Sequence, residues 1–320
     1  MQYRQLPQLP DQPLSVLGFG SASISGEGGG YGFGPISEED SITLVRKAWE
    51  RGINVFDTAP IYGFGEAERR LGRALKPFRE KIFLLSKSGV TWDRHRRVDI
   101  DNSVSTTQRM LEQSLRDLNT DWIDLYLVHW PDPRHDIRST IEYLAKAREQ
   151  GKINHIGLSN TNSGDLQRAL EIAPILAVQG ESNLFVRRQQ TSFLSDLEQL
   201  QIGFFAWGTF DKGILTGRVT PARTFQKPDA RAHAPWWKNA DRTRKFAAMQ
   251  DLAALASTHG FTLTEMALSA VLSQAQLTSA LVGIRDLAQL ESAVEALQRP
   301  LSAELLGDVQ AIVDRHLSPQ

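Results

Sequence analysis

The stretch Ile53-Asn54-Val55-Phe56-Asp57 decides the fold, because a short apolar run ends directly in an acid. Four later runs also end at side chains that can do chemistry: 82–87 at Lys87, 122–129 at His129, 153–160 at Ser159-Asn160 and 177–179 at Gln179. Each run has the length of a buried strand, and a helix-like stretch follows each. Because the carboxyl ends of parallel strands meet at one mouth of a barrel, we expect these side chains to converge there.

The alternation of strand-like and helix-like stretches predicts a closed barrel. We predict strands at 17–20, 53–57, 82–87, 122–129, 153–158, 176–179, 202–207 and 279–283, and helices from 37 and at 65–76, 104–119, 137–150, 163–173, 188–200, 241–258, 263–274 and 286–297. Eight strands in this alternation favour an α/β fold of the (β/α)8 TIM-barrel class over an open doubly wound sheet. Without a tandem repeat or a low-complexity linker, residues 1–320 are expected to form a single domain.

Two predicted loops are longer than is usual for such folds. Residues 88–101 follow the third strand and residues 208–240 follow the seventh, so both are expected at the mouth of the barrel. Long loops in that position commonly carry function. Trp92, Trp130 and Trp236 lie on mouth loops and are predicted to wall an apolar substrate pocket.

Composition excludes several classes of function. Lys and Arg total 36 against 37 Asp and Glu, so the net charge of −1 predicts no nucleic-acid partner and no basic membrane-binding face. The absence of cysteine excludes disulfides, thiolate metal sites and a cysteine nucleophile. No apolar stretch approaches the roughly 20 residues that span a bilayer. The start of the chain lacks the apolar segment of a secretory signal, so a cytoplasmic protein is expected. The seven histidines show no metal-binding spacing, and no metal is predicted.

Four separated positions suggest a chemistry. Asp57 ends a strand, Tyr62 follows it on a loop, and Lys87 and His129 end two later strands. With their flanks, these positions resemble the aldo-keto reductase family, especially its bacterial members and the branch of the potassium-channel β-subunits. The motifs are FDTAPIYG at 56–63, GEAERRLGRAL at 65–75, LSKSG at 85–89, LYLVHWPDP at 125–133, GKINHIGLSN at 151–160 and GILTG at 213–217. The resemblance covers nearly the whole chain and implies a (β/α)8 barrel that reduces aldehydes, ketones or sugars to alcohols with NADPH.

The physical logic of the four side chains agrees with that resemblance. Hydride delivery to a carbonyl leaves charge on oxygen, so a proton donor must lie within hydrogen-bond reach. We assign Tyr62 as the general acid and expect the ammonium of Lys87 to lower the pKa of this phenol. Asp57 is expected to hold Lys87 and balance its charge. His129 is expected to orient the carbonyl oxygen or to assist proton transfer.

The nicotinamide end of the cofactor site is predicted from the resemblance, because the chain has no G-x-G-x-x-G turn after Gly20. In the family a Ser-Asn pair and a Gln hold the nicotinamide amide, and Ser159, Asn160 and Gln179 match them. Trp207 matches the aromatic that stacks on the nicotinamide, as in the channel β-subunits. The usual Ser-Pro-Leu that follows is replaced by Gly208-Thr209-Phe210, which changes the expected path of the pyrophosphate loop.

The phosphate end of the cofactor site is predicted from two further segments. Gly20, at the end of the first strand, is also predicted to bind the cofactor. Arg218 matches a basic position of the family that contacts the pyrophosphate. Gly283, Arg285 and Gln289 resemble the adenosine-phosphate segment, which lies where a strand opens into a helix whose N-terminus attracts phosphate. A bidentate contact from Arg285 to a 2′-phosphate favours NADPH over NADH. The Asn common in the family four residues after the Gln is Ala293 here.

Alternative interpretations remain open at this point. A non-catalytic, NADPH-binding regulatory subunit is suggested by Trp207, and a Schiff-base lyase by a Lys at the end of a barrel strand. The glycine-rich stretch 26–34 lacks the Lys-Ser/Thr ending of a phosphate loop and is interpreted as a lip at the mouth. The basic run 94–97 fits a solvated loop better than an anion site.

Overall fold

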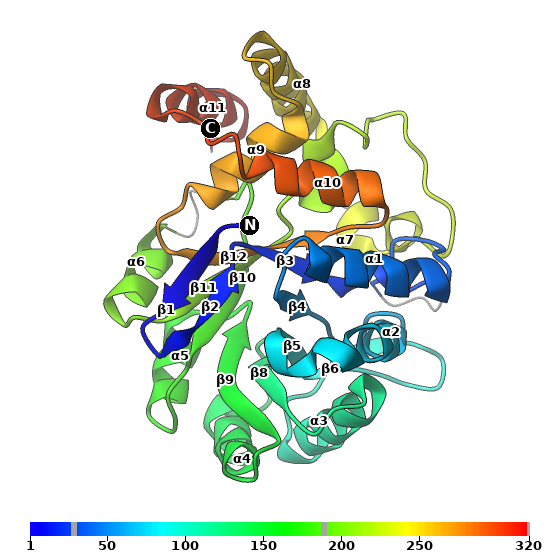
Figure 1. The fold of residues 1–320 in the computed structure, drawn as a ribbon, viewed down its shortest axis with the longest axis vertical. Coiled ribbons are helices and arrows are strands. Elements are labelled where there is room, and N and C mark those ends of the chain that lie inside the picture. The colour runs from blue at the N-terminus through cyan, green and yellow to red at the C-terminus, as the bar shows by residue number, and fades with distance from the viewer. Residues whose placement is uncertain (27–30, 187–190, 319–320) are drawn as a thin grey trace.

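Eight parallel strands close into a barrel in the computed structural model, which describes residues 1–26, 31–186 and 191–318 (Figure 1). The barrel strands are β3 (Leu17–Gly20), β4 (Val55–Asp57), β5 (Phe83–Ser88), β8 (Ile123–Val128), β9 (Ile153–Ser159), β10 (Ala177–Glu181), β11 (Gly203–Trp207) and β12 (Leu277–Gly283). Their order around the barrel is β10, β11, β12, β3, β4, β5, β8 and β9. The predicted barrel class is confirmed, and all eight carboxyl ends face one mouth.

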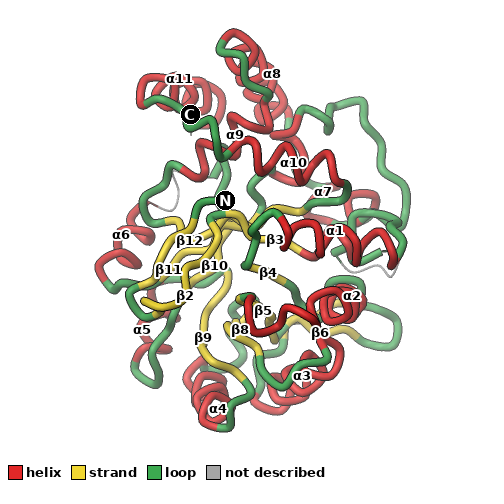
Figure 2. The backbone as a smooth tube through the Cα atoms, in the orientation of Figure 1, coloured by secondary structure: helices red, strands yellow, loops and turns green. Residues whose placement is uncertain are grey.

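Helices surround the barrel, as the tube in Figure 2 shows. They are α1 (Glu38–Glu50), α2 (Glu66–Leu75), α3 (Val104–Leu118), α4 (Ile137–Glu149), α5 (Ser163–Leu170), α6 (Thr191–Gln199), α7 (Pro235–Lys238), α8 (Thr243–Thr258), α9 (Leu263–Leu272), α10 (Leu287–Ala296) and α11 (Ala303–Leu317). The 3₁₀ turns are η1 (Ser21–Ile24), η2 (Lys76–Lys81), η4 (Asp211–Thr216) and η5 (Ala230–Ala232). Ser37 caps α1 as predicted, since its side chain accepts a hydrogen bond from the backbone of Asp40.

The alternation of side chains along each strand produces two apolar layers. One layer fills the barrel and includes Val55, Phe83, Leu85, Leu125, Leu127 and Phe205. The other lies between the barrel and the helices and includes Phe56, Leu84, Tyr126, Val128 and Ile156. Because apolar side chains occupy both faces of the strands, polar chemistry is concentrated where the strands end.

An N-terminal hairpin that the sequence patterns did not predict closes the floor of the barrel. Strands β1 (Tyr3–Leu6) and β2 (Leu9–Ser15) pair antiparallel. Leu6, Leu9 and Leu14 pack with the side chains that fill the barrel. The amide of Asn54, just before β4, donates a hydrogen bond to the carbonyl of Pro13 at 2.8 Å, which places the hairpin at the end opposite the mouth. Ligands are therefore admitted from the mouth.

Three predicted segments differ from the structure. The predicted loop 88–101 contains a hairpin of β6 (Val90–Trp92) and β7 (Val98–Ile100), and 208–240 contains η4, η5 and α7. The predicted helix 188–200 is observed as α6 from Thr191, and residues 187–190 lie outside the described residues. Helix α11 was not predicted; it buries Leu305, Val309, Ile312 and Val313 in a cluster shared with α8 and α9. Among the described residues, no helix is both long and apolar enough to span a bilayer.

Replacing Gly72 by Ala is expected to destabilise the fold, because α2 packs against the backbone of Leu118 at the end of α3 at this glycine. An added Cβ would lie 2.3 Å from the carbonyl oxygen of Leu118, and backbone atoms cannot give way cheaply. We expect Gly72→Ala to lower the free energy of unfolding by about 1–3 kcal/mol, measured by urea denaturation. Gly307→Ala in α11 is the control, since nothing lies within 4 Å of its added Cβ. It should raise stability by about 0.5–1 kcal/mol. Equal effects of the two substitutions would contradict this account.

Candidate active site

The ends of the barrel strands place six polar or aromatic side chains around one mouth. Asp57 ends β4, Lys87 is the penultimate residue of β5, and His129 directly follows β8. Ser159 ends β9, Gln179 is the central residue of β10 and Trp207 ends β11. The register pairs Gln179 with Ser159, so their side chains lie side by side. These residues, predicted from separate runs, are brought together by barrel closure.

The ammonium of Lys87 is the most deeply buried charge at the mouth, with 0% exposure. Its Nζ donates a hydrogen bond to the Oδ1 of Asp57 at 2.6 Å and another to the carbonyl of Thr58 at 2.8 Å. The same Oδ1 accepts a 2.7 Å hydrogen bond from the side-chain amide of Gln179. Burial lowers the pKa of Lys87, and the charge of Asp57 opposes that effect. The carboxylate is thus the counter-ion that lets a lysine be charged in this position.

Tyr62 lies on the loop after β4, facing Lys87 and His129. A turn fixes it, since its backbone N–H donates to the carbonyl of Ala59 at 3.0 Å. The Nζ of Lys87 is 5.2 Å from the centroid of the Tyr62 ring. The Tyr62 and His129 ring centroids are 6.0 Å apart, and the rings are nearly perpendicular. The four predicted side chains therefore form one cluster.

The expectation of a lowered pKa for Tyr62 is not met. Burial raises the pKa of Tyr62 well above its ordinary value, and the charges of Asp57 and Tyr31 raise it further. The phenol consequently keeps its proton throughout the physiological pH range.

His129 is held as a neutral imidazole. Burial lowers its pKa well below the ordinary value, and the charge of Lys87 lowers it further. Its backbone is fixed on both sides: the N–H donates to the carbonyl of Ser88 at 2.9 Å, and the carbonyl accepts from the amide of Asn160 at 2.9 Å. A protonated phenol and a neutral imidazole side by side can both hydrogen-bond one carbonyl oxygen.

A chain of amide groups lies next to this cluster and fits the carboxamide of a nicotinamide. The side chain of Ser159 donates to the Oε1 of Gln179 at 3.4 Å, and the amide of Asn160 donates to Ser159 at 3.0 Å. The indole N–H of Trp207 donates to the Oδ1 of Asn160 at 3.0 Å. Because Gln179 points its NH₂ at Asp57, its Oε1 faces Ser159 as the acceptor. Amide oxygens as acceptors and a hydroxyl as donor match the donor and acceptor pattern of a primary carboxamide.

The predicted phosphate end lies on the neighbouring strands. Gly20 and Gly283 are paired at the ends of β3 and β12. The guanidinium of Arg285 donates to the backbone carbonyls of Phe33, Gly34 and Pro35, and the side chain of Gln289 accepts from the backbone of Arg285 at 3.0 Å. Among the described residues, no carboxylate forms an ion pair with Arg285. Its guanidinium is held by backbone carbonyls and not by a carboxylate, which suits a phosphate.

The loop that begins at Gly208 has an unusual backbone. Gly208 adopts φ 71°, and Asp211, Lys212 and Gly213 are three consecutive residues with positive φ. The ammonium of Lys212 pairs with Glu181 at the end of β10 and lies 5.7 Å from the Trp207 ring centroid. These two charged residues at the mouth were missed by the sequence patterns, because only the fold brings them to Trp207. Phe210 is half-buried at the start of η4, and the side chain of Arg218, just after it, is exposed.

Aromatic side chains surround Tyr62 on the loops of the mouth. Trp92 packs on Phe64 with ring centroids 5.1 Å apart, Trp130 lies 6.5 Å from Trp207, and Trp236 stacks on Tyr31 at 6.5 Å. Trp130 and Trp236 are each 36% exposed. Tyr31 and Phe64 were missed by the sequence patterns, since single aromatics in loops carry no pattern. The three tryptophans predicted for a substrate pocket all lie on this rim.

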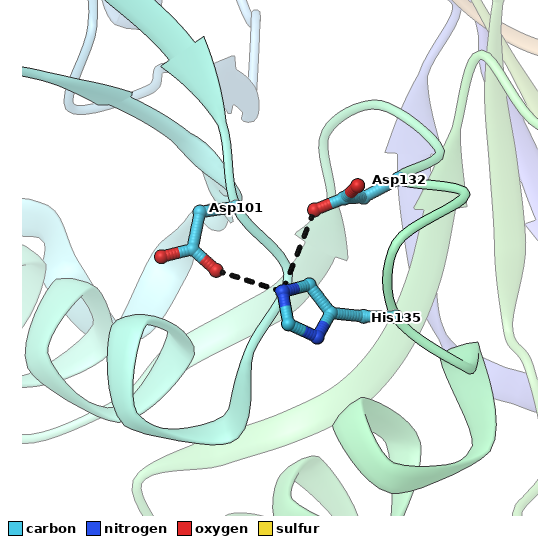
Figure 3. Close-up of side chains that lie close together, drawn as sticks. All are labelled: Asp101, Asp132 and His135. Atoms are coloured by element: carbon cyan, nitrogen blue, oxygen red, sulfur yellow. Dashed lines mark ion pairs between the residues drawn. The ribbon is translucent and has the colours of Figure 1, made fainter.

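Ion pairs connect the segment 99–101 to the loop 132–135 at the mouth. Figure 3 shows those of His135 with Asp101 and Asp132. The Nε2 of His135 is 3.4 Å from Asp101 and 3.9 Å from Asp132. Arg134 adds a bridge from Asp132 at 2.9 Å to Asp99 at 3.2 Å. The possible metal-ligand atoms of these two acids and the histidine lie within 4.8 Å of one another. Arg134 already pairs with Asp132, so the protein itself supplies a positive charge to this carboxylate. The cluster thus joins the β6–β7 hairpin, which carries Trp92, to the loop that carries Trp130.

Comparison with known proteins agrees with this geometry. The profile of the Aldo/keto reductase family matches residues 16–314. The chain is 33% identical over 307 residues to the aldo-keto reductase YhdN of Bacillus subtilis, covering 95% of this chain and 91% of that protein. It is 27% identical to the NADH-specific methylglyoxal reductase of Escherichia coli, covering 95% of this chain and 97% of that protein.

A solved structure is also similar across the whole fold. The glycerol dehydrogenase of Gluconobacter oxydans superposes with a TM-score of 0.86 at 30% identity, covering 99% of this chain and 97% of that one. The barrel, the cluster at its mouth and these matches lead to one assignment: the chain belongs to the aldo/keto reductase family and is an NAD(P)H-dependent oxidoreductase.

Proposed function

We propose that the protein reduces a small-molecule aldehyde, ketone or sugar to the alcohol with NADPH. The observation that carries the proposal is the meeting of a protonated phenol and a neutral imidazole beside a buried Lys87–Asp57 pair. Similar proteins named as a methylglyoxal reductase and a glycerol dehydrogenase support carbonyl and alcohol chemistry. The aromatic rim at the mouth suits a substrate with apolar surface next to its carbonyl.

Tyr62 is the general acid of the proposed reaction. When bound, the nicotinamide supplies the hydride. His129 donates a hydrogen bond to the carbonyl oxygen and fixes its position next to the phenol. As charge develops on that oxygen, Tyr62 transfers its proton, because an alkoxide is a much stronger base than a phenolate even when the pKa of the phenol is raised.

Lys87 and Asp57 support that transfer from behind the phenol. The ammonium faces the ring of Tyr62 and stabilises the negative charge left on it after the proton leaves. Asp57 holds the ammonium at 2.6 Å and keeps it charged in a buried position. Gln179 links this pair to the nicotinamide side of the site, since it hydrogen-bonds Asp57.

Residues of five strands and of the loops that follow β9, β11 and β12 hold the cofactor in this proposal. Ser159, Asn160 and Gln179 bind the carboxamide, and Trp207 stacks on the ring. Gly20, Gly208, Phe210, Arg218 and Gly283 line the path of the pyrophosphate, and Arg285, positioned by Gln289, binds the 2′-phosphate. The lack of a carboxylate partner for Arg285 among the described residues supports NADPH, although a similar protein is named as NADH-specific.

The two alternatives predict different behaviour. A Schiff-base lyase needs an approach to the Nζ of Lys87, but that side chain is 0% exposed and its ammonium is held by Asp57 and Thr58. A regulatory subunit would bind NADPH without turnover. Trp207 alone favours that alternative, whereas the complete cluster of acid, lysine, tyrosine and histidine favours a reductase.

Tyr62→Phe is expected to abolish reduction while leaving NADPH binding intact. The wild type is assayed by loss of NADPH absorbance with benzaldehyde, methylglyoxal, glyceraldehyde, acetone and xylose. Removing the proton donor should lower kcat by about a hundredfold to ten-thousandfold. Tyr143→Phe is the control, since this phenol lies on α4, which packs on the outside of the barrel, and kcat should not change. NADPH binding by fluorescence with no turnover of any carbonyl by the wild type would favour the regulatory alternative.

Asp57→Asn is expected to destabilise the protein because it leaves the ammonium of Lys87 buried without a counter-ion. The cost should be about 3–5 kcal/mol, measured by urea denaturation at neutral pH. Because the unfolded lysine keeps its proton while the buried one loses it, the stability of the variant should rise with pH. The double variant Asp57→Asn/Lys87→Met should recover most of the loss. Full stability of the single variant would show that the pair is not a buried charge pair.

Arg285→Ala is expected to remove the preference for NADPH. Losing charge-assisted hydrogen bonds to a 2′-phosphate should raise the KM for NADPH about tenfold or more and leave the KM for NADH nearly unchanged. Arg218→Ala is the matched control: it should raise both KM values together, since both cofactors carry the pyrophosphate. Unchanged KM values in Arg285→Ala would contradict the assignment of the 2′-phosphate site.

A further inference from the structure

Glu68 is a fully buried acid that the proposed reaction does not use. It lies in α2, within the motif at 65–75, and is 0% exposed. Its Oε1 accepts a hydrogen bond from the hydroxyl of Ser86 at 2.7 Å. Among the described residues, its buried Oε2 has no hydrogen-bond partner. A carboxylate in this position is costly, because one of its oxygens has lost water without gaining a donor.

Further buried hydroxyls belong to the same region between the barrel and helices α2 and α3. These are the side-chain oxygens of Ser88 on β5, Ser114 on α3 and Tyr126 on β8. Ser86 and Tyr126 are paired in register on adjacent strands. Glu68 thus belongs to a polar cluster embedded in an apolar layer, and a protonated carboxyl has a proton to donate within it.

Lys87 lies on the other side of the same strand. Ser86 points outward to Glu68, and its neighbour Lys87 points inward to Asp57, because successive side chains alternate across a strand. The charge of Glu68 raises the pKa of Lys87, second to the effect of Asp57. Only the thickness of the barrel wall separates the two groups, so the low polarity between them screens their interaction weakly.

Glu68 titrates near neutral pH. Burial raises its pKa to about 7, and the hydroxyls of Ser86 and Ser114 oppose this. The charged or titratable groups that face it are Asp117 on α3, which raises its pKa further, Lys87 on β5, which lowers it, and Tyr126 on β8. The pKa of Tyr126 is raised well above its ordinary value by burial and by Glu68, so this phenol stays neutral.

We propose that Glu68 is a positioning residue for the reductase reaction, acting through Lys87 on the acid strength of Tyr62. The proposal rests on the function proposed above. When Glu68 is protonated, the ammonium of Lys87 has Asp57 as its one close counter-ion. When Glu68 is ionised, a second negative charge weakens the positive field that Lys87 presents to Tyr62. Reduction is therefore faster with Glu68 protonated and slows as it ionises.

The test is the pH dependence of kcat for reduction, using the carbonyl compound that the wild type reduces fastest in the panel above. In the wild type kcat should fall as the pH rises through about 7. Glu68→Gln imitates the protonated acid and cannot ionise, so the fall of kcat near pH 7 should be absent from its profile. The KM for NADPH should not change. Ser86→Ala removes the hydrogen bond to the carboxylate and raises the pKa of Glu68. It should therefore move the fall of kcat to higher pH, with less risk to folding.

Glu66→Gln is the matched control on the same helix. Burial raises the pKa of Glu66, but hydrogen bonds from Arg69 and Arg70 outweigh this effect and lower it below the ordinary value. Glu66 is therefore already ionised at neutral pH. Its profile should coincide with that of the wild type. Infrared spectroscopy supplies a readout independent of turnover: a band of a protonated carboxyl should disappear as the pH rises through about 7 in the wild type and be absent in Glu68→Gln.

Two results would overturn the proposal. One is a fall of kcat at the same pH in the wild type, Glu68→Gln and Ser86→Ala, with each variant differing from the wild type by the same ratio at every pH. That result would indicate an acid with a structural role alone. The other is the absence of the titrating infrared band. Failure of the proposed function is recognised separately, because the wild type would then reduce no carbonyl compound at any pH while the infrared band still titrates.

Discussion

The burial of one ammonium group is the constraint on which the mouth of the barrel depends. Lys87 is fully enclosed, so its charge requires a carboxylate, a backbone carbonyl and a fixed distance to each. Asp57 meets that requirement from the adjacent strand and is itself held by Gln179 from across the barrel. A single buried charge therefore orders side chains from three strands, and the remaining groups of the site are arranged around them.

The protonation states at the mouth follow from this arrangement. The positive charge of Lys87 and burial keep His129 neutral, while burial and the negative charge of Asp57 keep the proton on Tyr62. The site thus presents two neutral hydrogen-bond donors next to a balanced ion pair. Such a site binds an uncharged carbonyl without repulsion and becomes more complementary as charge develops on the oxygen, which is the condition for catalysis by differential binding.

Much of the fold and of the site was predictable from short patterns. The strand runs that end at Asp57, Lys87 and His129 predicted both the barrel and the side chains at its mouth, because length and apolar content are local properties. Helix α11 and the N-terminal hairpin were missed, since each is stabilised by packing on other elements rather than by its own pattern. The pKa of Tyr62 was predicted in the wrong direction, because the degree of burial of a phenol and the charges around it are not readable from sequence.

The sequence by itself determined the order of the elements, the residue types at the strand ends and the family, since these depend on spacing along the chain. Only the tertiary structure decided which groups interact across the barrel: the link from Gln179 to Asp57, the aromatic rim around Tyr62, and the position of Glu68 behind Lys87. The physical reason is that charge, burial and hydrogen bonding act through space over a few ångströms, whereas these residues are separated by tens of residues along the chain.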